Sequence, residues 1–124
     1  MFNGNDKNNS FKFGNALVFI RKIIAIIPLI TKAFIEVKNV TLSRKKRIAE
    51  FPDAVTSRGL KHINQLIKAG KKKYKIFILY LIQRDDCQSF SIAKDIDPEY
   101  AYALRKAVKN NLNILCYDCK FSSK

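Results

Sequence analysis

Glu36 and Lys38 are the two residues of this sequence whose types and spacing best fit a chemical role. They stand two positions apart within residues 33–42, AFIEVKNVTL, a segment rich in β-branched residues. Alternate residues of a strand point to one face, so the carboxylate and the ammonium are expected to lie side by side. Such a pair can share a divalent metal and a phosphate oxygen, as in metal-dependent nucleases. A solvated strand face often carries the same pattern, so the pair alone leaves both explanations open.

Basic residues follow this segment in two groups. The densest is the run at 44–47, which consists of Arg44, Lys45, Lys46 and Arg47. The second lies on a predicted helix, whose polar side carries Arg58, Lys61, Gln65 and Lys68 opposite Leu60 and Ile63. A solvated loop and a solvated helix face would show the same patterns. We predict that nucleic-acid phosphates contact Arg44, Lys45, Lys46, Arg47, Arg58 and Lys61.

Neither histidine nor cysteine offers a set of metal ligands with a recognisable spacing. His62 has no acid or cysteine at ligand spacing, so capping or packing is its expected role. Cys116 and Cys119 form a single C-x-x-C pair, which is weak evidence for zinc without a second pair. Three cysteines without paired spacings favour free thiols in a reducing compartment, and we predict a cytoplasmic protein.

The charge balance points to a polyanionic partner. Lysine and arginine number 24 against 10 acidic residues, which gives a formal net charge of +14 over 124 residues. Anionic membranes also attract basic proteins, so charge alone does not exclude lipid. The most apolar stretch, 16–30, is interrupted by Arg21, Lys22 and Pro28 and is too short to span a bilayer, and 1–15 does not resemble a signal peptide. We therefore expect nucleic acid, with no membrane partner.

Hydrophobic periodicity and turn residues predict the elements that position these side chains. The predicted strands cover 33–42, 48–51, 74–83 and 112–121, and the predicted helices follow N-caps at Thr56 or Ser57 and at Asp97. The run 74–83 is apolar almost throughout, as in a central strand buried on both faces. This order predicts an α/β fold with a mixed sheet flanked by helices. Residues 1–15 have no apolar period and are expected to be poorly ordered.

Four ordered blocks resemble the sugar fermentation stimulation protein family. They are IEVKNVTL, FPDAVTSRGLKHINQLI, ILYLIQR and IDPEYAYALRKAVKNNLNILCY, and together they extend from about residue 33 to residue 117. The resemblance implies a DNA-binding protein linked to sugar utilisation. It also implies a restriction-endonuclease-like, PD-(D/E)xK-like core in the C-terminal domain, with an oligonucleotide-binding barrel ahead of it.

By this resemblance, Glu36 and Lys38 correspond to the Glu-x-Lys pair of the nuclease-like core. Asp53 and Arg58 fall in the family's Phe-Pro-Asp-Ala and Arg-Gly blocks, and Asp53 is a third candidate catalytic acid. The family also has an acid in an Arg-x-Asp-Phe block before the Glu-x-Lys strand, but residues 7–35 contain no acid here. Glu36 is therefore the one candidate ligand for Mg²⁺, and the resemblance favours binding over catalysis.

The N-terminal part does not match the family. Residues 1–32 show none of its blocks, so we expect residues 33–124 to form the nuclease-like DNA-binding domain, with a core that is incomplete at its N-terminus. A truncated or frame-shifted copy of the gene would explain this. The predicted function is phosphate-backbone binding of double-stranded DNA; the alternatives are an Mg²⁺-dependent nuclease and a non-functional remnant.

Overall fold

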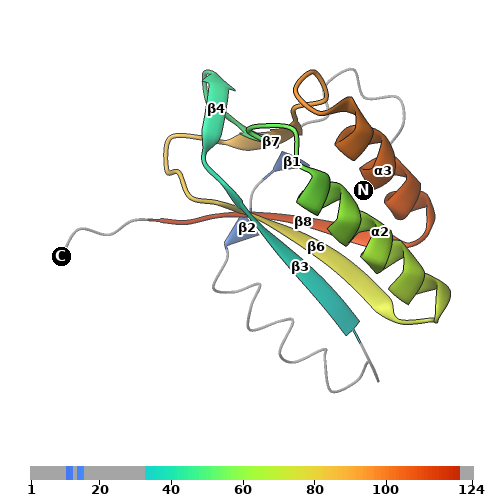
Figure 1. The fold of residues 1–124 in the computed structure, drawn as a ribbon. Helices are drawn as coiled ribbons and strands as arrows, with labels where there is room; N and C mark the ends of the chain where they lie inside the picture. The colour runs from blue at the N-terminus through green and yellow to red at the C-terminus, as the bar shows by residue number, and fades with distance from the viewer. Residues whose placement is uncertain (1–10, 13, 16–32, 121–124) are drawn as a thin grey trace.

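Three apolar segments form the parallel strands of one sheet in the computed structural model, which describes residues 11–12, 14–15 and 33–120 (Figure 1). They are β3 (Ala33–Val40), β6 (Lys75–Ile82) and β8 (Leu112–Asp118), and the short β2 (Gly14–Asn15) extends the sheet beyond β8. The strand order is β2-β8-β6-β3, and every neighbouring pair is parallel. The run KIFILYLI thus lies between two strands, as the continuous apolar pattern predicted.

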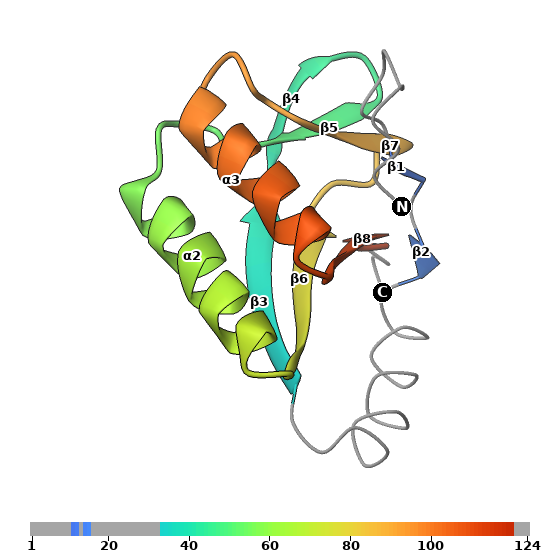
Figure 2. The ribbon, with the colours of Figure 1, turned by 90° about the vertical axis from the view of Figure 1, so that its right-hand side faces the viewer.

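A second sheet, in the order β1-β7-β5-β4, lies at one end of the first (Figure 2). Its strands are β1 (Phe11–Lys12), β4 (Leu42–Lys45), β5 (Ile48–Phe51) and β7 (Ser89–Ile92). β4 and β5 form an antiparallel hairpin, and Arg47 in its turn adopts a left-handed backbone conformation with φ of 62°.

The strands differ from the sequence-based expectations in three places. The basic run 44–47 lies outside the predicted strands 33–42 and 48–51, but Arg44 and Lys45 belong to β4, and Lys45 pairs with Ile48 of β5 across the hairpin. β7 was not predicted, because its four residues are too short to show a clear period. Within the stretch expected to be poorly ordered, Phe11–Lys12 pairs with β7 and Gly14–Asn15 pairs with β8.

Two helices cover one face of the parallel sheet and pack against each other (Figure 2). The first, α2 (Ser57–Lys71), follows the N-cap Thr56, whose hydroxyl accepts a hydrogen bond from the Gly59 amide. The second, α3 (Pro98–Lys109), begins with a proline at its first turn and ends before Asn110. Both helices confirm the predicted starts, and neither described helix is long and apolar enough to cross a membrane.

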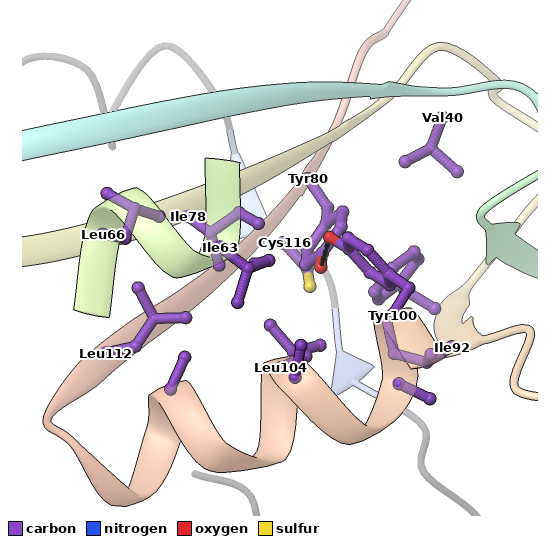
Figure 3. Packing of buried hydrophobic residues seen from close by; sticks show 14 of the residues in the cluster. Val40, Ile63, Leu66, Ile78, Tyr80, Ile92, Tyr100, Leu104, Leu112 and Cys116 are labelled. Atoms are coloured by element: carbon purple, nitrogen blue, oxygen red, sulfur yellow. Dashed lines mark hydrogen bonds between the residues drawn. The ribbon is translucent and has the colours of Figure 1, made fainter. Parts of the chain in front are cut away.

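The hydrophobic core lies between the two helices and the helix-facing side of β6 and β8 (Figure 3). Its most buried aliphatic side chains include Ile63, Leu104, Ile76 and Ile78. Tyr80 and Tyr100 are also fully buried, and their hydroxyl oxygens lie 2.6 Å apart, so each polar group has a partner inside the core. The core therefore holds α2, through Ile63, Leu66 and Ile67, in place over the parallel sheet.

The buried carboxylate of Asp97 joins the starts of the two helices. One oxygen accepts the Tyr100 amide at 2.9 Å as the N-cap of α3, and the other accepts the Thr56 amide at 2.9 Å, just before α2. The two helices also approach closely here, because a Cβ added at Gly59 of α2 would come within 3.2 Å of the Tyr100 ring on α3. Asp97 therefore sets where both helices begin.

Replacing Asp97 should destabilise the fold. Asp97→Ala leaves two amides without their acceptor, and we expect the free energy of unfolding to fall by about 1–3 kcal/mol in a urea titration. Asp53→Ala is the matched control, since that acid is exposed and should change stability by less than about 0.5 kcal/mol. Equal effects of the two substitutions would contradict the role assigned to Asp97.

Candidate functional site

Glu36 and Lys38 lie on the face of β3 that is turned toward α2. The Lys38 ammonium is 2.9 Å from Glu36 Oε1, so the two side chains form a salt bridge along the strand. Their side chains are only 26% and 12% exposed. The period of two thus brings a carboxylate and an ammonium together at the border between sheet and helix.

His62 of α2 completes a cluster with these two residues. Its Nδ1 donates a hydrogen bond of 2.5 Å to Glu36 Oε1 and lies 3.2 Å from the Lys38 ammonium. From the sequence, His62 was assigned to capping or packing, and its hydrogen bond to Glu36 was not predicted. One signal was present in the sequence: the helix that connects two adjacent parallel strands must lie across them, and His62 borders its apolar face.

The cluster of Glu36, Lys38 and His62 holds a charged carboxylate and an oriented imidazole. Partial burial acts to raise the pKa of Glu36, but the hydrogen bonds from Lys38 and His62 outweigh it, so the pKa lies below its ordinary value of 4.5. An imidazole that donates through Nδ1 to a carboxylate keeps Nε2 as the acceptor in its neutral form. The cluster can therefore offer a cation to a phosphate oxygen and a nitrogen that accepts a proton.

Asp53 is not brought into this cluster. It lies in the bend after β5 with an exposed side chain, and it makes no hydrogen bond or ion pair with another described residue. Within residues 11–12, 14–15 and 33–120, no group of three or more His, Cys, Asp or Glu side chains is arranged to hold a metal ion. In the described part of the chain, the cluster thus contributes one carboxylate and one imidazole as possible ligands.

Arg44 binds two carboxylates of the protein itself. Its guanidinium donates to Glu50 at 2.7 and 3.0 Å and to Asp95 at 2.6 and 2.9 Å. These hydrogen bonds lower the pKa of Glu50 despite its burial, and they lower that of Asp95 to about 2. Arg44 therefore anchors the hairpin to the segment before α3, and a role in phosphate contact remains a prediction.

The other five predicted phosphate contacts are exposed. Lys45, Lys46 and Arg47 lie at the tip of the hairpin, and Arg58 and Lys61 lie on the first two turns of α2. None of them forms a salt bridge with a residue in the described part of the chain. Their charges are therefore open to an anionic ligand, unlike that of Arg44.

Known proteins are similar to this chain in sequence. Residues 28–124 match the family model described as the sugar fermentation stimulation protein RE domain. Sugar fermentation stimulation protein homologs from Pelagibacter ubique and Roseobacter denitrificans are 54% and 50% identical over 93 and 84 residues, which are 75% and 68% of this chain. The chain spans only about 40% and 36% of these relatives' lengths.

A solved structure of a similar protein has a similar fold. The structure of Pyrococcus furiosus SfsA in complex with Ca²⁺ matches with a TM-score of 0.66 and 28% identity, over 69% of this chain and 37% of that one. The predicted fold class, a mixed α/β nuclease-like core flanked by helices, is confirmed, with its strands divided between two sheets.

Removing the Arg44 guanidinium should destabilise the protein in a pH-dependent way. Arg44→Met removes both guanidinium hydrogen bonds and leaves the buried Glu50 carboxylate with the backbone amide of residue 44 as its donor, so we expect the midpoint of urea unfolding at pH 7 to fall. The wild-type pKa of Glu50 is lowered, so its stabilising effect is present above the ordinary value of 4.5 and is lost as pH falls through the lowered pKa.

The difference between wild type and Arg44→Met should therefore shrink in acid. Lys45→Met is the control, because this neighbouring cation is exposed and forms no salt bridge with a described residue. A pH-independent difference, or an equal loss in the control, would argue against the Arg44–Glu50 interaction.

Proposed function

Because the chain belongs to the sugar fermentation stimulation protein family, we propose that it binds double-stranded DNA through the phosphate backbone. The observation that carries this proposal is the pair Arg58 and Lys61, which are exposed and without salt bridges to the described residues, on the helix that holds His62 over Glu36. Their charges face solvent beside the cluster, where a phosphate can reach both.

The first turn of α2 adds to this attraction. It contains no acidic residue, and the amide groups at a helix N-terminus carry partial positive charge. Arg58 and Lys61 are three positions apart and so occupy neighbouring places on the helix surface. A phosphate near them would meet two full charges and the helix dipole together.

The hairpin tip provides a second set of cations. Lys45 at the end of β4 and Lys46 and Arg47 in the turn are exposed, while Arg44 is held by Glu50 and Asp95. Contacts to phosphates hold a protein on DNA without reading its sequence. In this proposal the protein acts on sugar metabolism as a DNA-binding regulator.

Binding of a labelled DNA duplex across a salt series tests the proposal. The logarithm of the affinity should fall linearly with the logarithm of salt concentration, and Arg58→Ala should weaken binding and reduce the slope by about one. Arg105→Ala is the matched control, because Arg105 is an exposed arginine on α3. Absence of binding by the folded protein, or equal effects of both substitutions, would reject the proposed surface.

A second candidate function is an Mg²⁺-dependent nuclease, and the cluster of Glu36, Lys38 and His62 favours it. Mg²⁺ is commonly held by one or two carboxylates together with substrate phosphates. In the described residues the cluster supplies one such carboxylate, Glu36, and so suits a metal that is shared with bound nucleic acid. When bound, the ion would polarise the phosphoryl group. The similar Pyrococcus furiosus protein was solved with Ca²⁺, another divalent cation with oxygen ligands.

A cleavage assay with and without Mg²⁺ separates this candidate from simple binding. If the protein is a nuclease, Glu36→Gln and His62→Gln should each lower the rate by about 100-fold or more while duplex binding persists. Glu99→Gln, a change at an exposed acid of α3, should leave the rate unchanged. DNA binding without Mg²⁺-dependent cleavage would exclude this function and leave the binding proposal intact.

A further inference from the structure

A pocket of about 390 Å³ opens beside the cluster, between α2 and the edge of β3. Glu36 and His62 line one part of it, and its other walls come from the N-terminal end of β3, the second half of α2 and Tyr74. This volume falls within the range of roughly 300–1,000 Å³ that is typical of sites for small ligands. The pocket is therefore large enough for one nucleotide and adjoins the residues that could act on it.

Aromatic and apolar side chains form the inner surface of the pocket. Phe34 and Tyr74 are in ring contact, with centroids 5.3 Å apart and planes tilted by 57°. Phe34 is nonetheless 48% exposed, which is unusual for a side chain whose full burial would contribute roughly 1.5–3 kcal/mol. Leu66 and Ala69 of α2 complete the apolar part. A flat, weakly polar group could cover the exposed ring face.

Cations stand at the margin of the same pocket. Lys68 and Lys72 line it and are exposed, and neither forms a salt bridge with a residue in 33–120. Lys68 follows Arg58 and Lys61 along the exposed side of α2, and Lys72 is the C-cap of this helix. The cations on this side of α2 therefore extend from Arg58, a proposed duplex contact, to Lys72 at the pocket, over roughly 20 Å of helix.

An aromatic platform with lysines beside it is the combination that binds single-stranded nucleic acid. Bases stack on aromatic rings with a contribution of about 1–3 kcal/mol each, while cations follow the backbone. A base within a duplex has neighbours on both faces and a partner on its edge, so it reaches a pocket only when it is unpaired or turned out of the helix.

We propose that this pocket binds one unpaired nucleobase, which stacks on Phe34 while Lys68 and Lys72 contact the flanking phosphates. The inference rests on the proposed function, because it assumes that nucleic acid lies along α2. It adds a substrate class, namely DNA with an unpaired nucleotide such as a single-stranded overhang, next to the pair of Glu36 and His62.

The probe for this inference is a DNA duplex with a single-stranded overhang that carries the fluorescent base 2-aminopurine, whose emission falls on stacking. We expect quenching on binding, and tighter binding than to the same duplex with blunt ends. Phe34→Ala should abolish the quenching and weaken binding to the overhang substrate by about tenfold, while blunt-duplex binding stays the same.

Two further variants keep the test specific. Phe34→Tyr retains an aromatic ring and should retain the quenching. Tyr102→Ala removes an aromatic side chain on α3 that is 73% exposed, and should change nothing. Circular dichroism establishes that each variant is folded.

The outcomes separate this inference from the function on which it rests. Salt-dependent duplex binding without quenching, or quenching that survives Phe34→Ala, would overturn the pocket assignment and leave duplex binding in place. If the folded protein binds neither substrate, both the proposed function and the pocket assignment are rejected. A preference for lipid vesicles or peptides over the overhang would likewise overturn the assignment.

Discussion

The buried carboxylate of Asp97 is the interaction on which the position of the candidate site depends. It accepts the Thr56 amide before α2 and the Tyr100 amide in the first turn of α3, so the two helices start from one shared acceptor. His62 lies on α2 within two turns of that point. A helix that began elsewhere would carry the imidazole away from Glu36. The geometry of the cluster is therefore set at a distance, by a residue that takes no part in it.

Local sequence patterns were sufficient to predict the two helices and the long strands of the parallel sheet. Thr56 and Asp97 are strong N-caps, Pro98 suits a first turn, and the apolar run of β6 is too continuous for a half-exposed strand. The division of the strands between two sheets could not be predicted from such local patterns. It depends on the parallel pairing of β5 with β7, a four-residue strand whose partner lies far away along the chain.

The candidate site shows the same limit. Glu36 and Lys38 were found because a period of two is a local property of a strand. His62 was missed because its contact with Glu36 spans 26 positions and exists only when α2 crosses β3. The sequence does not distinguish Arg44 from the basic residues beside it. Its guanidinium nevertheless forms salt bridges with Glu50 and Asp95, the latter 51 positions away. The chemistry of a residue type can be predicted from sequence, but its partners follow from topology.

The parallel sheet also determines how the chain can fold. β6 pairs on one side with β3 and on the other with β8, and each pairing closes a long loop that contains a helix. Such non-local pairings form slowly, because chain entropy is lost before the strands make their contacts. The β4–β5 hairpin and the two helices are local and can form earlier. The contact between Glu36 and His62 requires α2 to dock on β3, so it reports on the packing of the helix against the strand rather than on either element alone.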